Sequence, residues 1–259
     1  MNPAPAHLQL IRTCVLHTVR TATVRDDQVG WVVRGRKRLS TATGEHGFSA
    51  GRAFVMARAT QWDMRNEPPP GGLYEVRLMS FAPRTVARFH ERFGQFAALP
   101  AVQGCASTEA DAGFTASFSH AMAALLDDDA SAALREHRAF EVLLLMAERG
   151  IVFAPMHDLS WADRVHRLVA QRLHAAWTVD GIAAAFHVSA STLQRRLGEE
   201  GTTASGCVRE ARMEAAMAML QGTERQVSEI AAHCGYDSHS RFTAAFRQRF
   251  GYAPSHLRP

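Results

Sequence analysis

The stretch "SEIAAHCGYDSHSRFTAAFRQRFGYAP", residues 228–254, decides how the C-terminal part of this chain folds. A small, alanine-rich segment runs into a Cys-Gly-Tyr corner, and beyond the corner Phe242, Phe246 and Phe250 recur every fourth residue. Four-residue spacing places apolar side chains on one face of a helix. Because glycine tolerates the backbone that a tight turn needs, the pattern predicts a short helix, a turn at Gly235 and a second helix anchored by phenylalanines.

An earlier stretch, "DGIAAAFHVSASTLQRRLGEEG" at 180–201, repeats this pattern. Each copy has Ile-Ala, a corner four residues after that alanine (His187 or Gly235), an apolar residue and then a helix with apolar anchors, here Leu193 and Leu197. The second copy has one more residue between corner and anchor. Two tandem copies indicate a pair of helix-turn-helix motifs much more specifically than one copy would.

The segment 203–222 between the two copies predicts a single helix of about 19 residues, roughly 28 Å long. A spacer of that length can hold two reading helices about one DNA turn, near 34 Å, apart. Both helices could then enter successive major grooves on one face of the duplex.

With these motifs in order, the region from Asp158 to Arg258 resembles the DNA-binding region of the AraC/XylS family of bacterial transcription regulators. The ending, with Gly251, Tyr252, Pro254 and Arg258, matches the C-terminal signature of that family. The N-terminal part resembles the cupin-like regulatory barrel of the family in outline, followed by helices that serve dimerisation in several members.

The resemblance implies which side chains would face bases. In the first motif they are Ser191, Gln194 and Arg195, and their chemistry agrees, since arginine can bind guanine and glutamine can bind adenine through two hydrogen bonds. In the second motif the corresponding positions are His239, Ser240, Thr243 and Ala244. Ala244 departs from the longer hydrogen-bonding residues of several members, so the second motif could mainly hold the DNA backbone.

Arginines near these positions are predicted to meet phosphates, and a solvated surface role is the alternative for each of them. They are Arg196, Arg241, Arg247 and Arg249.

The N-terminal region has a different period. Residues 10–82 hold short runs rich in Val, Thr, Phe and Tyr, separated by turn residues, which predicts an antiparallel sheet or a small barrel. Helices are predicted over 83–96, 115–126 and 131–149, the last capped by Ser131 and ended by Gly150. The expected fold is therefore α+β, with a cupin-like antiparallel β-barrel and helices in a regulatory domain, residues 1–150. The segment 151–160 breaks the pattern, and an all-α DNA-binding domain, residues 158–259, follows.

One face of the third predicted helix reads as an apolar seam. Two interpretations stay open and do not exclude one another: burial against the barrel of the same chain, or a helix-to-helix contact in a homodimer. The seam residues are Ala133, His137, Phe140, Leu144 and Ala147.

Several classes of protein are disfavoured. No window approaches the roughly 20 apolar residues of a membrane span, and no export signal begins the chain, so a cytoplasmic location is expected. Four cysteines lie far apart without a Cys-x-x-Cys pair, which argues against zinc, redox exchange and the zinc-held cysteine of methyl-transferring repair regulators. Only His17 and His46 occur within 10–82, with no His-x-His, so we expect neither a metal nor another cofactor.

Aromatic and methionine residues of the strands allow two interpretations. They could line a pocket for a small apolar effector, or they could simply form the core, as such residues usually do. The residues concerned are Trp31, Trp62, Phe48, Phe54 and Met56.

The charge balance is only modestly basic. The chain has a formal net charge of +4, and residues 158–259 carry 12 arginines against 10 acidic residues, a net +2. DNA affinity would then depend on how charges are placed and on a dimer or an RNA polymerase partner. We expect a transcription activator without catalytic activity, controlled by a small effector or a protein partner; the alternative is a helical protein-interaction module, which weak salt dependence would distinguish.

Overall fold

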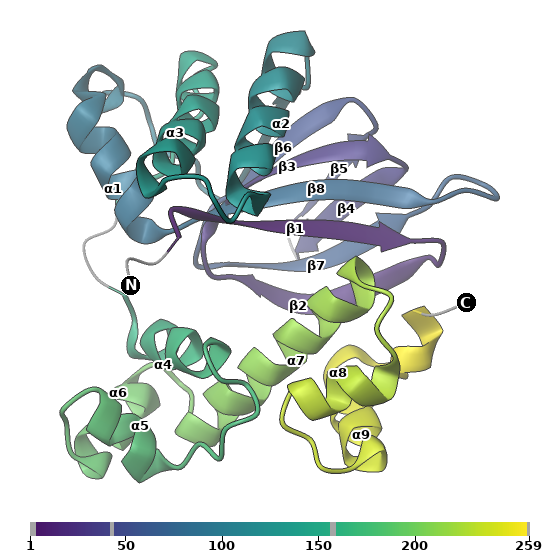
Figure 1. Ribbon diagram of the computed structural model, residues 1–259, viewed down its shortest axis with the longest axis vertical. Coiled ribbons are helices and arrows are strands. Elements are labelled where there is room, and N and C mark those ends of the chain that lie inside the picture. Colours follow the sequence, from purple (N-terminus) through teal and green to yellow (C-terminus); the bar gives the residue numbers. More distant parts are fainter. Residues whose placement is uncertain (1–3, 42–43, 156–158, 258–259) are drawn as a thin grey trace. The chain divides into compact units, whose positions relative to one another are not determined.

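The chain forms two compact units, Met1–His157 and Asp158–Pro259. The computed structural model describes residues 4–41, 44–155 and 159–257 (Figure 1). Asp158 and Arg258, the ends of the region on which the family resemblance rests, and part of the predicted break at 151–160 lie outside the described residues. The roles assigned to the two domains stay predictions.

The first unit is built on antiparallel strands that form two sheets within the described residues. One sheet has the strand order β1-β8-β3-β6-β9 and the other β2-β7-β4-β5. In place of the expected barrel the unit has a pair of sheets. The strand β9 of the five-stranded sheet lies outside residues 10–82, the range in which strands were predicted. The strands are β1 (Ala6–Thr13), β2 (His17–Val24), β3 (Asp27–Arg34), β4 (Arg36–Thr41), β5 (Gly44–Ser49), β6 (Arg52–Met56), β7 (Thr60–Glu67), β8 (Tyr74–Phe81) and β9 (Cys105–Glu109).

Both sheets contribute side chains to one apolar core. Phe48 and Phe54 stack with ring centroids 5.1 Å apart, and Met56 and Trp62 are buried in the same cluster. Trp31 packs instead against the cluster that the sheet shares with the helices. Phe48, Phe54, Met56 and Trp62 therefore belong to this core and Trp31 packs against the neighbouring cluster, as the core interpretation predicts.

Three buried polar residues lie side by side on neighbouring strands of the four-stranded sheet: His17 on β2, Asn66 on β7 and Lys37 on β4. Asn66 pairs with His17 on one side and Lys37 on the other. Lys37 Nζ donates to Asn66 Oδ1 at 3.3 Å, and the Asn66 amide lies 3.2 Å from His17 Nε2. Lys37 is the only lysine of the chain and is 2% exposed, and its burial lowers its pKa to about 8.

Three helices cover the other face of the five-stranded sheet: α1 (Pro83–Arg92), α2 (Ala112–Leu126) and α3 (Ala132–Glu148) (Figure 1). Proline in the first turn begins α1, which ends at Arg92, and a 3₁₀ turn, η1 (Gly94–Phe96), completes the predicted range. Asp111 caps α2, and Ser131 caps α3 by accepting a hydrogen bond from the Leu134 amide at 3.1 Å. Gly150, at φ 76°, follows the end of α3 as predicted.

Burial of the predicted α3 seam within its own chain is wrong for the first half of the helix. Ala133 and His137 are exposed, whereas Phe140 and Ala147 are buried. The second half of the helix packs against both α1 and α2, so its buried arc is wider than one seam and also takes in Val142. The dimer contact stays a prediction.

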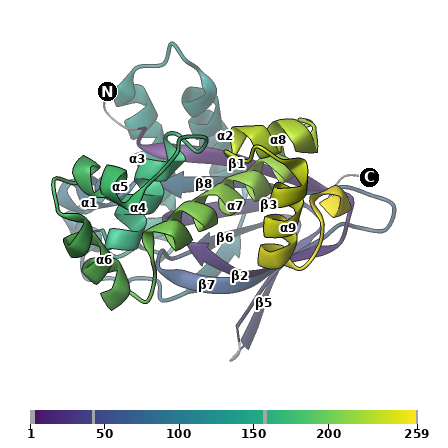
Figure 2. The same ribbon diagram turned by 90° about the horizontal axis from the view of Figure 1, so that it is seen from below.

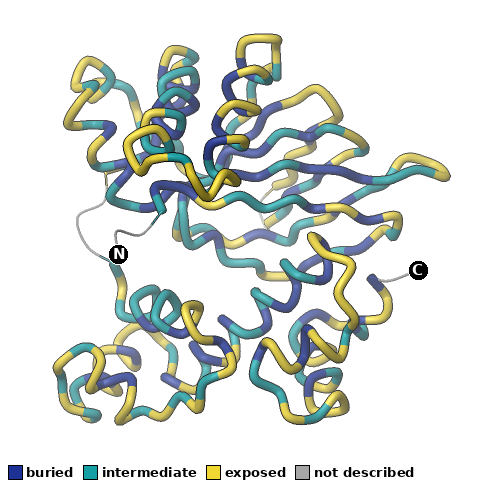
Figure 3. The backbone as a smooth tube through the Cα atoms, viewed as in Figure 1, coloured by how far each residue is buried: buried dark blue, intermediate teal, exposed yellow. Residues whose placement is uncertain are grey.

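In its described residues, 159–257, the second unit contains helices and no strands. Figures 1 and 2 show one group of helices at the N-terminal end of the long helix α7 and another at its C-terminal end. Buried positions recur along the whole of α7 (Figure 3), because both groups pack against it. The elements are α4 (Trp161–Ala170), α5 (Val179–Ala185), α6 (Ala190–Glu199), α7 (Ala204–Gly222), α8 (Val227–His233), α9 (His239–Phe250) and a 3₁₀ turn η2 (Pro254–Leu257).

Candidate nucleic-acid interface

The two predicted corners close through the same backbone hydrogen bonds. After α5, His187 N donates to Ala184 O and Val188 N to Ala183 O, both at 3.1 Å. After α8, Gly235 N donates to Ala232 O and Tyr236 N to Ala231 O, both at 3.0 Å. Both corner residues are left-handed, with φ 55° at His187 and 75° at Gly235. The repeat read from the sequence is therefore a repeat of backbone geometry.

A serine begins the second helix of each motif. Ser189 accepts from the Thr192 amide at 3.1 Å and begins α6, and Ser238 accepts from the Arg241 amide at 3.4 Å and begins α9. The cap follows the corner by two residues in the first motif and by three in the second. The extra residue of the second copy is accommodated between corner and cap, so the helices themselves stay equivalent.

Apolar anchors determine which face of each second helix points outward. Leu193 and Leu197 are completely buried in the first motif, as are Phe242 and Phe246 in the second. The ring centroids of Phe246 and Phe250 lie 4.6 Å apart, and those of Phe242 and Phe246 lie 5.8 Å apart, so the aromatic side of α9 forms a continuous cluster of tilted rings. The opposite face of each helix is left for solvent or a partner.

The base-facing residues predicted for the first motif are all exposed on α6. Gln194 is exposed, and Ser191 Oγ lies 3.0 Å from the capping Ser189 Oγ. Arg195 is 59% exposed and pairs with Glu199 at 2.6 Å, one turn further along the helix. An exposed pair of this spacing is worth only about 0.3–0.5 kcal/mol, so a base or a phosphate can replace Glu199 at little cost.

The second motif presents fewer of its predicted readers. His239 and Ser240 are exposed in the first turn of α9, with Ser240 Oγ 2.7 Å from Ser238 Oγ. Thr243 is half-buried, and its hydroxyl oxygen is buried without a hydrogen-bond partner among the described residues. A contact between Thr243 and a base would require that side chain to rotate.

The arginines predicted to meet phosphates fall into two groups. Arg196, Arg241 and Arg247 are exposed on α6 and α9. Arg249 instead donates to both carboxylate oxygens of Glu210 on α7, with distances of 2.6–2.9 Å. Arg249 thus ties the last turn of α9 to α7, a structural role that competes with a phosphate contact.

Some carboxylates of the unit carry interactions that the sequence did not reveal. Glu210 is one of them, and Glu200 is another: its two oxygens accept from the amides of Trp161 and Ala162 at 2.8 Å at the start of α4. Both pairs join residues nearly 40 positions apart. Local spacing carries no signal for contacts of that range.

No described helix is long and apolar enough to cross a membrane. Within residues 4–41, 44–155 and 159–257, no cluster of three or more His, Cys, Asp or Glu side chains offers a metal site.

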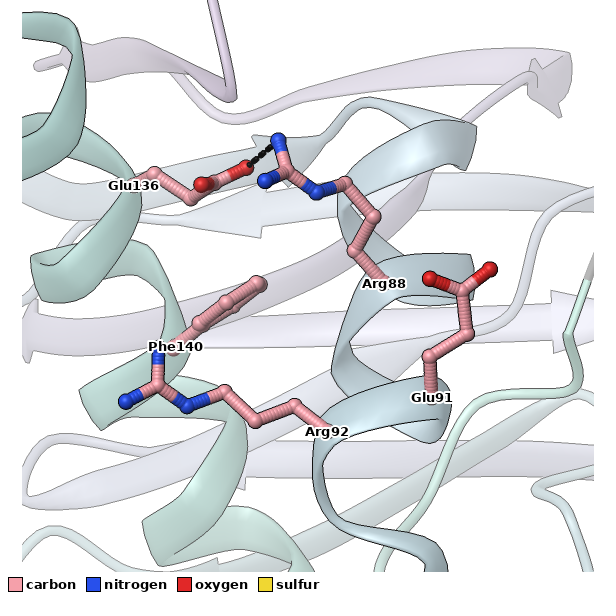
Figure 4. A pocket seen from close by; sticks show the side chains of 5 residues that line it. All are labelled: Arg88, Glu91, Arg92, Glu136 and Phe140. Atoms are coloured by element: carbon pink, nitrogen blue, oxygen red, sulfur yellow. Dashed lines mark hydrogen bonds and ion pairs between the residues drawn. The ribbon is translucent and has the colours of Figure 1, made fainter.

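A surface hollow of about 270 Å³ lies between α1 and α3 in the first unit (Figure 4). Arg88 pairs with Glu136 at 2.6 Å, and Glu91, Arg92 and Phe140 complete the lining. The two arginines and two glutamates of the lining leave this hollow without net charge.

The sequence comparisons agree with the geometry of the second unit. Residues 182–259 match a family model described as a helix-turn-helix domain. The regulator YdeO of Shigella flexneri, a helix-turn-helix transcriptional regulator, is 33% identical over 131 residues, which cover 48% of this chain and 51% of that protein. Residues 182–259 belong to the AraC/XylS family of helix-turn-helix domains.

Other relatives extend the similarity of this AraC-type domain. The transcriptional activator NphR of a Rhodococcus species is 35% identical over 102 residues, covering 39% of this chain and 30% of NphR. This chain therefore spans about half, or less, of the length of these curated relatives.

Solved structures support the fold of the whole chain. ToxT from Vibrio cholerae matches with a TM-score of 0.64 at 12% identity, covering 98% of this chain and 97% of ToxT. Another ToxT structure, bound to an unsaturated fatty acid, matches with a TM-score of 0.63 at 12% identity, covering 98% of this chain and 95% of that one. The order of a sheet-rich first unit and a helical second unit is therefore shared with the fold of ToxT.

Proposed function

We propose that the chain is a sequence-specific DNA-binding regulator that activates transcription. The observation that carries the proposal is the tandem corner: two equal backbone closures, each followed by a capped helix whose apolar side is buried and whose polar side is exposed. Helix-turn-helix proteins read the major groove with such a second helix.

In this proposal the first motif supplies most of the sequence selectivity. Arg195 and Gln194 bind guanine and adenine edges, and Ser191 contacts a neighbouring base or phosphate. His239 and Ser240 make the base contacts of the second motif, with Thr243 contributing after rotation of its side chain. Exposed arginines on both helices bind phosphates.

The N-terminal unit controls the regulator through a small effector or a protein partner. The unsaturated fatty acid bound to ToxT favours a small effector for this chain too. RNA polymerase, a second copy of the chain and a cytoplasmic location complete the proposal. No catalytic step is part of it.

Selection from a randomised duplex DNA library tests the proposal with the full chain. We expect enrichment of one two-part motif with half-sites about one helical turn apart. Affinity for the enriched duplex should fall steeply between 50 and 200 mM salt, by about 10³-fold for six phosphate contacts, because bound counterions are released.

Absence of any enriched sequence, with or without candidate fatty acids, would contradict the proposal. Enrichment of proteins from a cell extract, with binding nearly independent of salt, would instead favour the protein-interaction module.

A further inference from the structure

Arg212 of α7 contacts the first group of helices, α4 to α6, which packs at the N-terminal end of α7. Its Nε donates to Leu173 O and its Nη2 to Ala175 O, both at 2.9 Å. The two carbonyls belong to the loop between α4 and α5. A planar guanidinium that donates to two fixed acceptors has a defined orientation. The two hydrogen bonds therefore fix the position of the α4–α5 loop along the axis of α7.

The same guanidinium also meets the corner of the second motif. It lies over the Tyr236 ring, 5.9 Å from the centroid. A Cβ added at Gly235 would lie 2.7 Å from Arg212 Nη2 and 2.8 Å from Leu173 O. The first group and the second corner therefore approach so closely that only a glycine fits between them.

A second tie acts at the other end of α9. Arg249, in its last turn, donates three hydrogen bonds to Glu210, two residues before Arg212 on α7. The second motif is thus held near its corner and at the end of its reading helix. Two separated points of attachment fix both the position of α9 and its rotation.

We propose that Arg212 is a positioning residue that sets the spacing and rotational phase of the two reading helices, so that the protein accepts its two DNA half-sites at one separation only. The inference rests on the proposed DNA-binding function. One inserted base pair moves a half-site by about 3.4 Å and rotates it by about 35°. Two motifs that can move relative to one another would still bind both half-sites after such an insertion, whereas two motifs held in a fixed arrangement would not.

The test uses the full chain, a randomised duplex library and three variants. We expect the wild-type protein to enrich two sequence blocks at one separation. Arg212→Met, which loses both carbonyl contacts, should enrich the same two blocks over several adjacent separations. Arg209→Met removes the same charge from an exposed position of α7 and should keep the single separation.

Direct affinities sharpen the test. Insertion of one base pair between the blocks should weaken wild-type binding about tenfold or more, as a mismatched base pair does, and Arg212→Met binding by less than about threefold. If Arg212→Met does not fold, Arg212→Lys, which keeps the charge but not the fork, should show the broadened spacing instead.

A single, unchanged separation for folded Arg212 variants would overturn the inference while leaving the proposed function intact. Enrichment of one block alone by the wild-type protein would overturn it as well. Failure of the wild-type protein to enrich any sequence would overturn the proposed function itself, so the two failures are distinguishable.

Discussion

The two corner residues show how one backbone shape is reached by different side chains. His187 adopts a left-handed conformation that costs a residue with a Cβ roughly 1–2 kcal/mol, and Gly235 adopts it without that cost. The glycine is required for a second reason, since its missing side chain leaves room for Leu173 O and Arg212. Only the first of these two reasons was available from the sequence.

Gly235→Ala should therefore lower the free energy of unfolding by about 2 kcal/mol or more, the sum of backbone strain and the close contact with Leu173 O. Gly251→Ala is the matched control, because Gly251 has φ 86° but open space around it and pays for strain alone. Urea denaturation of both variants measures the difference. Equal losses would mean that the contact at Gly235 relaxes freely.

Arg195 allows the most direct test of base recognition by the first motif. Arg195→Ala should cost about 1–3 kcal/mol at the preferred duplex and relax selectivity at one position. Competition binding with duplexes substituted at each position measures this, with Arg209→Ala as the control that removes an exposed charge outside the two reading helices. Uniform weakening of all duplexes by Arg195→Ala would refute base reading by this side chain.

At the scale of elements, the helices whose ends are marked by local chemistry were predictable. Ser131 caps α3 and Gly150 follows its end, as expected from the sequence alone. The buried face of α3 was not predictable, because packing against two neighbours, α1 and α2, widens the buried arc. The predicted exposure of Thr243 and Arg249 to DNA was uncertain for a similar reason, because the orientations of both side chains depend on contacts with the rest of the second unit.

The cluster of phenylalanine rings on α9 should dominate the stability of the second motif. Phe246→Ala removes a completely buried ring that contacts Phe242 and Phe250, and should cost about 3–5 kcal/mol. Gln248→Ala, at an exposed position of the same helix, should change stability by less than about 0.5 kcal/mol. Thermal unfolding of the two variants followed by circular dichroism compares them, and similar melting temperatures would contradict a core role for the ring.

At the scale of the whole molecule, Lys37 makes stability depend on pH. Its pKa is about 8 in the folded protein and about 10.5 when unfolded, so between these values the unfolded chain binds more protons. Stability from this group should rise by up to about 3 kcal/mol as the pH increases from 8 to 10.5, and the full penalty should apply below pH 8.

Lys37→Met should remove this dependence and be the more stable protein at pH 7, because an apolar side chain of similar length replaces a buried charge. Urea denaturation of both proteins at a series of pH values measures their free energies of unfolding. Burial also raises the pKa of Tyr74 and of Cys105, but both groups are present in the two proteins, so the difference between the two pH profiles reports Lys37. Parallel pH profiles would show that Lys37 is not desolvated in solution.

The extra residue in the second motif has a consequence for how DNA would be used. Two identical motifs related by symmetry read a palindrome, which looks the same in either sense. Here unequal motifs follow one another along a single chain, with Arg and Gln on α6 and His and Ser on α9. A duplex bound by the two motifs would therefore be directional: reversing the site relative to a transcription start would exchange which motif lies nearer the gene.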